Sequence, residues 1–198
     1  MSPRRKKPDP EKVREEILAA ARAQVSEGGP EGLSLRGVAR AVGYSPAGLY
    51  EYFDSRDAIL EALARRASAS LTRAFIEGRG KAPDEPPLVA LGLAYLRFSR
   101  ENREDFALLF QRLRSTRRGL EAPVGTDSSY ALLRAAVEEA REAGTLDGAA
   151  DPDAVAYAFW SLAHGMATLQ AGHLQGFDAD FEAADRAALR ALLAGFSA

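Results

Sequence analysis

The chain has 198 residues, of which 46% are hydrophobic and 27% charged, the ordinary balance of a globular protein with one domain or two small ones. It contains no cysteine, which excludes disulfides, thiolate metal sites and a cysteine nucleophile, and no apolar run approaches the roughly 18–20 residues of a membrane span. The net charge of −2 divides into +3 over residues 1–75 and −5 over residues 76–198.

The sequence opens with MSPRRKK, which holds four cations and no acid. A basic arm on a mildly basic N-terminal part is typical of a chain with a polyanionic partner, although a solvated terminal tail explains it as well. Because no apolar segment follows, the arm is not a secretory signal, and we expect a cytoplasmic protein.

Helix-forming residues dominate the whole chain, and the period-two alternation of strands is absent, so we predict an all-α fold. Stop signals such as GGP at 28–30 and GRGKAPDEPP at 78–87 separate the elements. The expected helices are about 11–27, 35–42, 46–52, 56–77, 88–102, 104–114, 127–143, 152–174 and 178–196.

The second and third helices are joined by Gly43–Tyr44–Ser45, which is the layout of a helix-turn-helix. Ser34 and Ser45 are good N-caps, and Gly43 can adopt the left-handed C-cap conformation. We expect the small side chain of Ala39 at the point where the two helices cross. The same spacing can also arise in a plain helical hairpin with tyrosines in its core.

The second helix of a DNA-binding helix-turn-helix enters the major groove of DNA, so the side chains at its start must be small. Pro46, Ala47 and Gly48 meet this requirement. The nearby tyrosines have rigid hydroxyl tips that can reach phosphates, whereas Leu49 and Phe53, four residues apart, should pack into the core. We predict DNA contacts from Ser34, Tyr44, Ser45, Pro46, Ala47, Gly48, Tyr50, Tyr52 and Arg56.

The stretch LSLRGVARAVGYSPAGLYEYFDSRDAIL, residues 33–60, resembles the signature of the tetracycline-repressor (TetR) family of bacterial regulators. It departs from that signature where Arg56 replaces a lysine, where Pro46 replaces a phosphate-binding lysine, and where Glu51 is acidic on the DNA side. The matching positions are Ser34, Ala39, Gly43, Ser45, Leu49, Tyr50, Phe53, Ser55 and Leu60.

The resemblance implies an N-terminal arm and three-helix DNA-binding domain over residues 1–56. A larger helical domain for effector binding and dimerisation would follow over residues 57–198, joined through the fourth helix. The last two helices have wide apolar faces and several small residues, which suits packing across a two-fold axis. We therefore expect a homodimer through these helices, although both could instead complete the core of one subunit.

Trp160 and His164 resemble the W-x-x-x-H-G element of one TetR C-terminal subfamily and lie four residues apart, on one helix face. They are candidates either for an effector pocket or for a buried, hydrogen-bonded pair in the core. A small hydrophobic effector would need an apolar pocket with few polar groups. The candidate pocket residues are Phe98, Phe106, Phe110, Tyr130, Trp160 and His164.

These observations predict a homodimeric regulator, most simply a repressor that a small effector releases from a palindromic operator in double-stranded DNA. The alternatives are an architectural or chromosome-organising DNA-binding protein of the same fold, or a helical partner-binding module. We expect no enzyme, cofactor or metal, because the sequence offers no phosphate loop, nucleophile elbow or ligand cluster.

Overall fold

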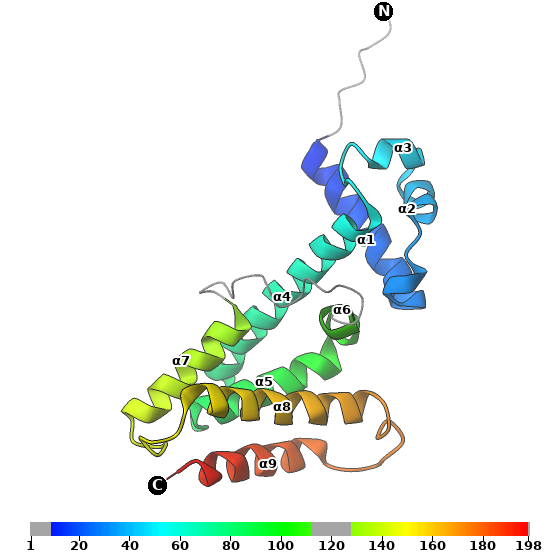
Figure 1. Cartoon of the computed structure of the whole chain (residues 1–198). Coiled ribbons are helices and arrows are strands. Elements are labelled where there is room, and N and C mark those ends of the chain that lie inside the picture. The colour runs from blue at the N-terminus through cyan, green and yellow to red at the C-terminus, as the bar shows by residue number, and fades with distance from the viewer. Residues whose placement is uncertain (1–8, 112–127, 198) are drawn as a thin grey trace, which may run out of the picture. The chain divides into compact units, whose positions relative to one another are not determined.

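The computed structural model describes residues 9–111 and 128–197, and over these ranges it contains nine α-helices, one 3-10 turn and no strand (Figure 1). The prediction of an all-helical chain is therefore confirmed. The described residues form two compact units. The first unit comprises residues up to 67 together with 107–111, and the second comprises 68–106 and 128–197. The domain division between residues 56 and 57 stays a prediction.

The first unit is built on α1 (Pro10–Gly28), α2 (Leu35–Val42), α3 (Pro46–Leu49) and the first part of α4 (Arg56–Lys81). Helix α1 contacts α2, and α2 contacts α3, as Figure 1 shows in the blue and cyan part of the chain. Their shared core consists of residues at helical spacing, as expected for amphipathic helices. Its largest fully buried members are Ile17, Val38, Leu49, Ile59 and Leu108.

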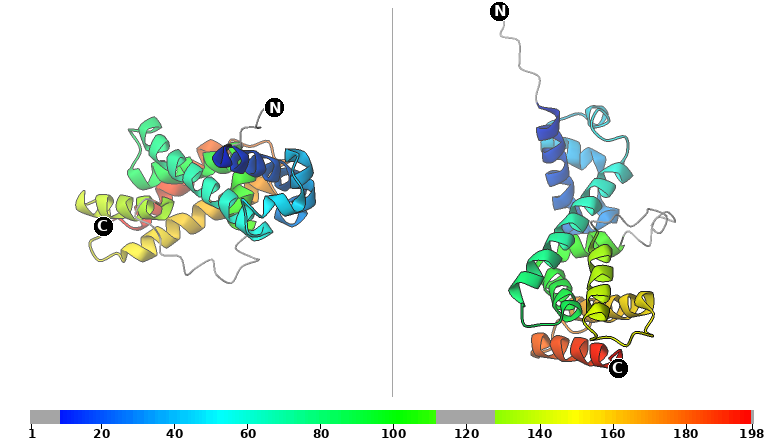
Figure 2. Two further views of the ribbon diagram at one scale, coloured as in Figure 1. Left: turned by 90° about the horizontal axis from the view of Figure 1, so that it is seen from above. Right: turned by 90° about the vertical axis from the view of Figure 1, so that its left-hand side faces the viewer.

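Helix α5 (Pro87–Glu101) is the centre of the second unit. Nearly every one of its side chains from Leu88 to Ser99 is buried, which a helix achieves only when neighbours surround it. It contacts α7 (Ser129–Glu142), α8 (Pro152–Ala171) and α9 (Phe181–Gly195), and the views of Figure 2 show these helices grouped around it.

Charged side chains of α9 form hydrogen bonds with neighbouring elements at two places. Asp185 is only 2% exposed, and its two oxygens accept from Arg100 Nη1 and Gln170 Nε2, both at 2.8 Å. Glu85 precedes α5, and its carboxylate accepts from Arg186 Nε at 2.9 Å and Arg190 Nε at 3.0 Å. These contacts supplement the apolar packing of α9 against α5, where Leu189 meets Gly92.

The third predicted helix is too long. Helix α3 ends at Leu49 rather than at Tyr52, because the next amides bond three residues back: Tyr50 N to Ala47 O at 3.2 Å and Glu51 N to Gly48 O at 3.4 Å. Such tightening is common at helix ends. Arg14 also donates to the carbonyl of Tyr52, which helps to hold the chain after α3 in this turn.

The fourth predicted helix is too short. Helix α4 continues through Gly78 and Gly80 to Lys81, where the sequence suggested a loop from residue 78. Gly78 is buried, and a β-carbon there would overlap the side chain of Ala94 on α5. The close approach of α4 and α5 therefore stabilises a helical segment that glycine alone disfavours.

The remaining boundaries differ from the prediction by a few residues. Helix α8 ends at Ala171 instead of 174, and α9 begins at Phe181 instead of 178, because Asp180 is the residue that caps it, accepting from Ala183 N at 3.0 Å. The predicted end of α6 (Arg103–Gln111) and the predicted start of α7 lie outside the described residues.

Candidate nucleic-acid interface and effector site

The two serines that were expected to cap the helix-turn-helix do so. Ser34 Oγ accepts from Gly37 N at 3.3 Å, and Ser45 Oγ accepts from Gly48 N at 3.0 Å. Between them Gly43 has a φ of 72°, the left-handed conformation that the turn requires and that glycine tolerates best. Both serines are exposed, and each hydroxyl keeps its proton for a phosphate oxygen.

The start of α3 presents a small and exposed surface. Pro46 and Ala47 are exposed and Gly48 is half-buried, whereas Leu49 is 1% exposed and anchors the helix in the core. A β-carbon on Gly48 would make ordinary contact at 3.4 Å with Ser45 Oγ and Tyr44 Cδ1. The fold therefore does not require glycine at this position, which leaves access to the outside as a reason for it.

The three tyrosines of the predicted site differ in their surroundings. Tyr50 is 55% exposed, whereas Tyr44 and Tyr52 are half-buried and pack against the core of the first unit. Their rings meet edge to face at 5.8 Å, and a hydrogen bond with Tyr44 is the main cause that raises the pKa of Tyr52. Of the three, only Tyr50 is exposed. The ring of Tyr52 is partly covered, so the predicted DNA contact of Tyr52 concerns its hydroxyl group.

Arg56 was predicted to bind phosphate, and in the structure it also holds the first unit together. Its Nε donates to Leu33 O at 2.9 Å, and its Nη2 donates to Pro30 O. These bonds tie the start of α4 to the segment before α2. A phosphate contact by its remaining N–H groups stays a prediction.

Two exposed arginines of α2 were not among the predicted DNA contacts. Arg36 and Arg40 are exposed and four residues apart on α2, so they share one helix face. The signal that could have identified them is simple: with Arg56, they are the cations nearest to the turn between α2 and α3. We add them to the candidate phosphate contacts.

In the second unit, Trp160 and His164 converge on a residue that the sequence did not single out, Tyr95 of α5. The Tyr95 hydroxyl lies 2.9 Å from His164 Nδ1, and Trp160 also bonds this phenol. Since an indole N–H can only donate, the tyrosine oxygen is the acceptor in the bond with Trp160, whereas the direction of the bond with His164 depends on which ring nitrogen carries the proton. Phe106 stacks beside this group, 5.8 Å from the His164 ring.

Burial shifts the titration of both polar members of this group. It raises the pKa of Tyr95 and lowers the pKa of His164 below its usual value. Both side chains are therefore uncharged at neutral pH. The group consists of aromatic faces with neutral hydrogen-bonding tips, which suits an apolar ligand with a polar end.

The other candidate pocket residues do not all join this group. Tyr130 lies 6.1 Å from the ring of Trp160, which is 42% exposed, so this pair faces outward in part. Phe98 is fully buried and lines a different, polar groove between α4 and α5. Phe110 belongs to the first unit.

The outer faces of α8 and α9 are rich in apolar and small residues, although Glu182 and Arg190 of α9 are exposed as well. Helix α8 exposes Tyr157 and Leu169, and Gly165 between them has open space where a side chain would be. Helix α9 exposes mainly small residues. They are Ala183, Ala184, Ala187, Ala191, Ala194 and Gly195.

Two kinds of feature are absent from residues 9–111 and 128–197. No helix there is long and apolar enough to cross a membrane. No group of three or more histidine, aspartate or glutamate side chains in the same ranges is arranged to hold a metal ion.

Two family models match the chain. Residues 17–63 match the bacterial regulatory proteins of the tetR family, and residues 88–195 match the tetracyclin repressor-like C-terminal domain. No curated protein sequence matches significantly.

Solved structures also match over nearly the whole chain. One is a protein of unknown function from Rhodococcus sp. RHA1, with 29% identity and a TM-score of 0.77 over 100% of both chains. Another is the TetR family transcriptional regulator PfmR from Thermus thermophilus, with 25% identity and a TM-score of 0.66 over 89% of this chain and 96% of the other. A third, described as the molecular basis for control of antibiotic production by bacterial hormones, has 26% identity and a TM-score of 0.64 over 92% and 95%.

These matches include the helix-turn-helix with its capped turn as well as the helical unit centred on α5. The proteins described by these two family models, and relatives such as PfmR, are DNA-binding regulators and not enzymes, and they typically act as dimers. The chain belongs to the tetracycline-repressor (TetR) family of DNA-binding transcriptional regulators.

Proposed function

We propose that this regulator is a homodimeric repressor that binds a palindromic operator and is released by a small, mainly hydrophobic effector. The observation that supports operator binding best is the exposed start of α3, where small residues precede the outward Tyr50. Side chains that enter a major groove must combine little bulk with a few polar tips. In this proposal Arg36, Arg40 and the two capping serines contact phosphates and fix the register.

The proposed dimer forms through α8 and α9. The apolar outer face of these helices and the small residues of α9 support close packing against the same helices of a second copy. A two-fold dimer presents two α3 helices to two half-sites, which is the reason for expecting a palindrome.

The proposed effector binds near Tyr95, Trp160 and His164. Their hydrogen-bonded tips, with Phe106 beside them, offer apolar surface and one polar end. This arrangement also supports placing the second domain in the W-x-x-x-H-G subfamily. The structural relative described as the molecular basis for control of antibiotic production by bacterial hormones gives a precedent for control by a hormone in a related protein.

Operator binding is tested by a gel shift with the DNA upstream of the protein's own gene. Tyr50→Ala should weaken binding by more than about 1 kcal/mol if this side chain touches DNA. Gly48→Ala should also weaken it while leaving the fold intact, since its β-carbon has room within the protein. Gly32→Ala is the matched control, because a β-carbon there also meets only an ordinary contact, at 3.9 Å, and lies outside α2 and α3.

If both the Tyr50 and the Gly48 variants bind the operator with unchanged affinity, α3 is not the helix that contacts the DNA bases. Arg36→Gln should reduce the slope of the logarithm of the binding constant against the logarithm of salt concentration by about 1, the loss of one phosphate contact. Arg65 is exposed on α4, and Arg65→Gln should leave this slope unchanged. Repression is tested with a reporter gene placed behind the bound DNA, and increased expression in the presence of the protein would contradict the repressor assignment.

Dimer formation is tested by sedimentation. Ala191 is exposed on α9, so Ala191→Arg should cost the subunit little stability but should abolish the dimer. A dimer that survives this substitution would exclude the proposed interface.

A further inference from the structure

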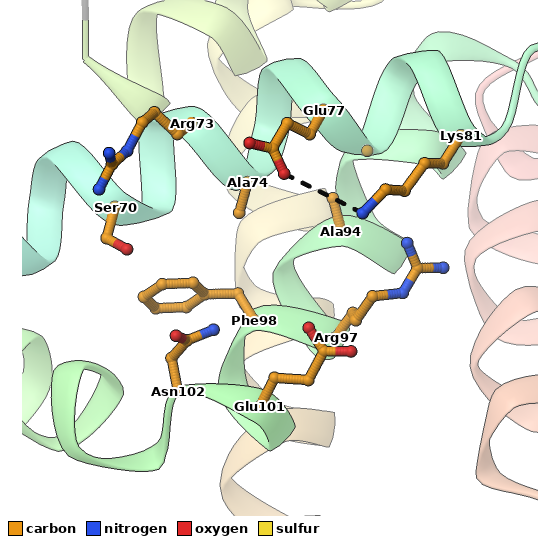
Figure 3. Close-up of a pocket in the computed structure, with 11 residues that line it drawn as sticks. Ser70, Arg73, Ala74, Glu77, Lys81, Ala94, Arg97, Phe98, Glu101 and Asn102 are labelled. Atoms are coloured by element: carbon orange, nitrogen blue, oxygen red, sulfur yellow. Dashed lines mark ion pairs between the residues drawn. The ribbon is translucent and has the colours of Figure 1, made fainter.

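A polar groove lies between the C-terminal part of α4 and α5, within the second unit (Figure 3). Its volume is about 260 Å³, which is below the range of about 300–1,000 Å³ for drug-sized ligands and so fits a small molecule. Its sides are charged and its floor is aromatic. The lining side chains that matter here are Arg73, Glu77 and Lys81 from α4, and Arg97, Phe98 and Glu101 from α5.

The groove exists because two helix backbones approach closely at one point. Gly78 of α4 packs against Ala94 of α5 with no space for a larger side chain. Long side chains must therefore leave this contact sideways, and they form the two walls. The floor is the ring of Phe98, which is 2% exposed and lies in Figure 3 between Ser70 and Asn102.

Cations outnumber acids in this groove. Glu77 is paired with Lys81 on its own helix at 4.0 Å. Within the described parts of the chain, neither Arg73 nor Arg97 has an ion pair or a side-chain hydrogen bond, although each lies four residues before a glutamate of the same groove. Arg97 is half-buried. Arg73 is exposed, so the N–H groups of both guanidinium groups are available to a bound anion.

The two arginines stand apart along the groove and offer two separate anchoring points (Figure 3). In Figure 3 Arg73 stands at one end of the groove, and Arg97 lies at the other end, with Lys81 on its side. A guanidinium binds carboxylate or phosphate oxygens through parallel N–H groups, and an apolar floor strengthens such contacts by keeping water away from one side.

We propose that this groove is a binding site for a small oxyanion, a carboxylate or a phosphate, held mainly by Arg97 and Arg73. Lys81 contributes positive charge, and Glu101 limits the affinity. The proposal does not depend on the operator or on the effector site, because every residue that it uses lies on the last turns of α4 or on α5 and Asn102 directly after it.

The test is calorimetric titration of the full-length protein with citrate and, separately, with inorganic phosphate, in sodium chloride of matched ionic strength. We expect saturable binding of at least one probe, and its identity separates carboxylate from phosphate recognition. Arg97→Gln and Arg73→Gln should each weaken binding by about tenfold or more, since a charge-assisted hydrogen bond contributes about 1.5–3 kcal/mol. Arg65→Gln, an exposed arginine of α4 outside the groove, is the matched control.

Glu101→Gln gives an independent readout, because removing a negative charge from the groove should tighten binding. Circular dichroism establishes that each variant is folded before titration. The proposal is overturned if neither probe binds beyond the effect of sodium chloride. It is equally overturned if binding survives both arginine substitutions, or if Arg65→Gln weakens it as much as they do.

Discussion

The most informative stability prediction concerns Asp185, the buried carboxylate that joins α9 to α5 and α8. Asp185→Ala removes the acceptor for Arg100 Nη1 and for Gln170 Nε2, two bonds of 2.8 Å each. Each hydrogen bond to a charged group contributes about 1.5–3 kcal/mol, and removing one partner of a fully buried ion pair costs about 3–5 kcal/mol.

The expected loss is somewhat smaller here. The Arg100 side chain is 34% exposed, so water can solvate it, and its Nη1 keeps a 2.9 Å bond to Gln170 Oε1. We therefore expect Asp185→Ala to lower the free energy of unfolding by about 2–4 kcal/mol.

The assay is urea denaturation followed by circular dichroism, at one protein concentration because dimer formation would add to the apparent stability. Asp178→Ala, at an exposed aspartate in the connection before α9, is the matched control and should change stability by less than about 0.5 kcal/mol. The double variant Arg100→Met with Asp185→Leu should be more stable than Asp185→Ala, because it removes both charges and leaves no unpaired guanidinium, while Gln170, which loses both bonds, is only half-buried. A loss below about 0.5 kcal/mol for Asp185→Ala would refute the reasoning.

Two further predictions concern other polar contacts of the second unit. Glu85→Gln should lower the free energy of unfolding by about 1–2 kcal/mol, because the Glu85 side chain is 10% exposed and accepts from two arginines that are 40% and 57% exposed. The control in urea denaturation is Glu182→Gln, at an exposed ion pair, which should cost less than about 0.5 kcal/mol. Equal losses for the two variants would contradict the role of burial. The lowered pKa of His164 means that the unfolded chain binds a proton more readily, so its contribution to stability is present above about pH 6.5 and is lost as the pH falls through the folded-state pKa. The urea midpoint should therefore fall between pH 7.5 and pH 5.5, less so in His164→Gln than in the wild type, and His173→Gln, at an exposed histidine, should keep the full decrease.

Local chemistry explains why the helix-turn-helix could be predicted from the sequence. The caps at Ser34 and Ser45 and the left-handed Gly43 depend on neighbouring backbone groups, and all three were found as expected. Leu49 and Phe53 were assigned to the core from their spacing alone, and both are buried. The contact of Tyr52 with Tyr44 was not predicted, because it joins residues on opposite sides of α3, and the DNA contact of Tyr52 stays a prediction.

Helix boundaries were predicted well only where the deciding contacts were local. Gly78 is a helix breaker by its intrinsic preference, yet it lies inside α4 because its missing side chain allows α5 to approach. Nothing in residues 70–81 taken alone contains that information, since Ala94 is remote in sequence.

Sequence spacing determined which face of α8 holds Trp160 and His164, and it determined the fold class and the position of the recognition element. Only the tertiary structure showed that both side chains meet Tyr95 of α5, that Asp185 is buried against Arg100, and that Arg73 and Arg97 line one groove. The physical reason is the range of the interactions. Periodicity and capping act over three or four residues. Each of these contacts instead joins two different helices, and such residues meet only when the helices pack in the folded protein.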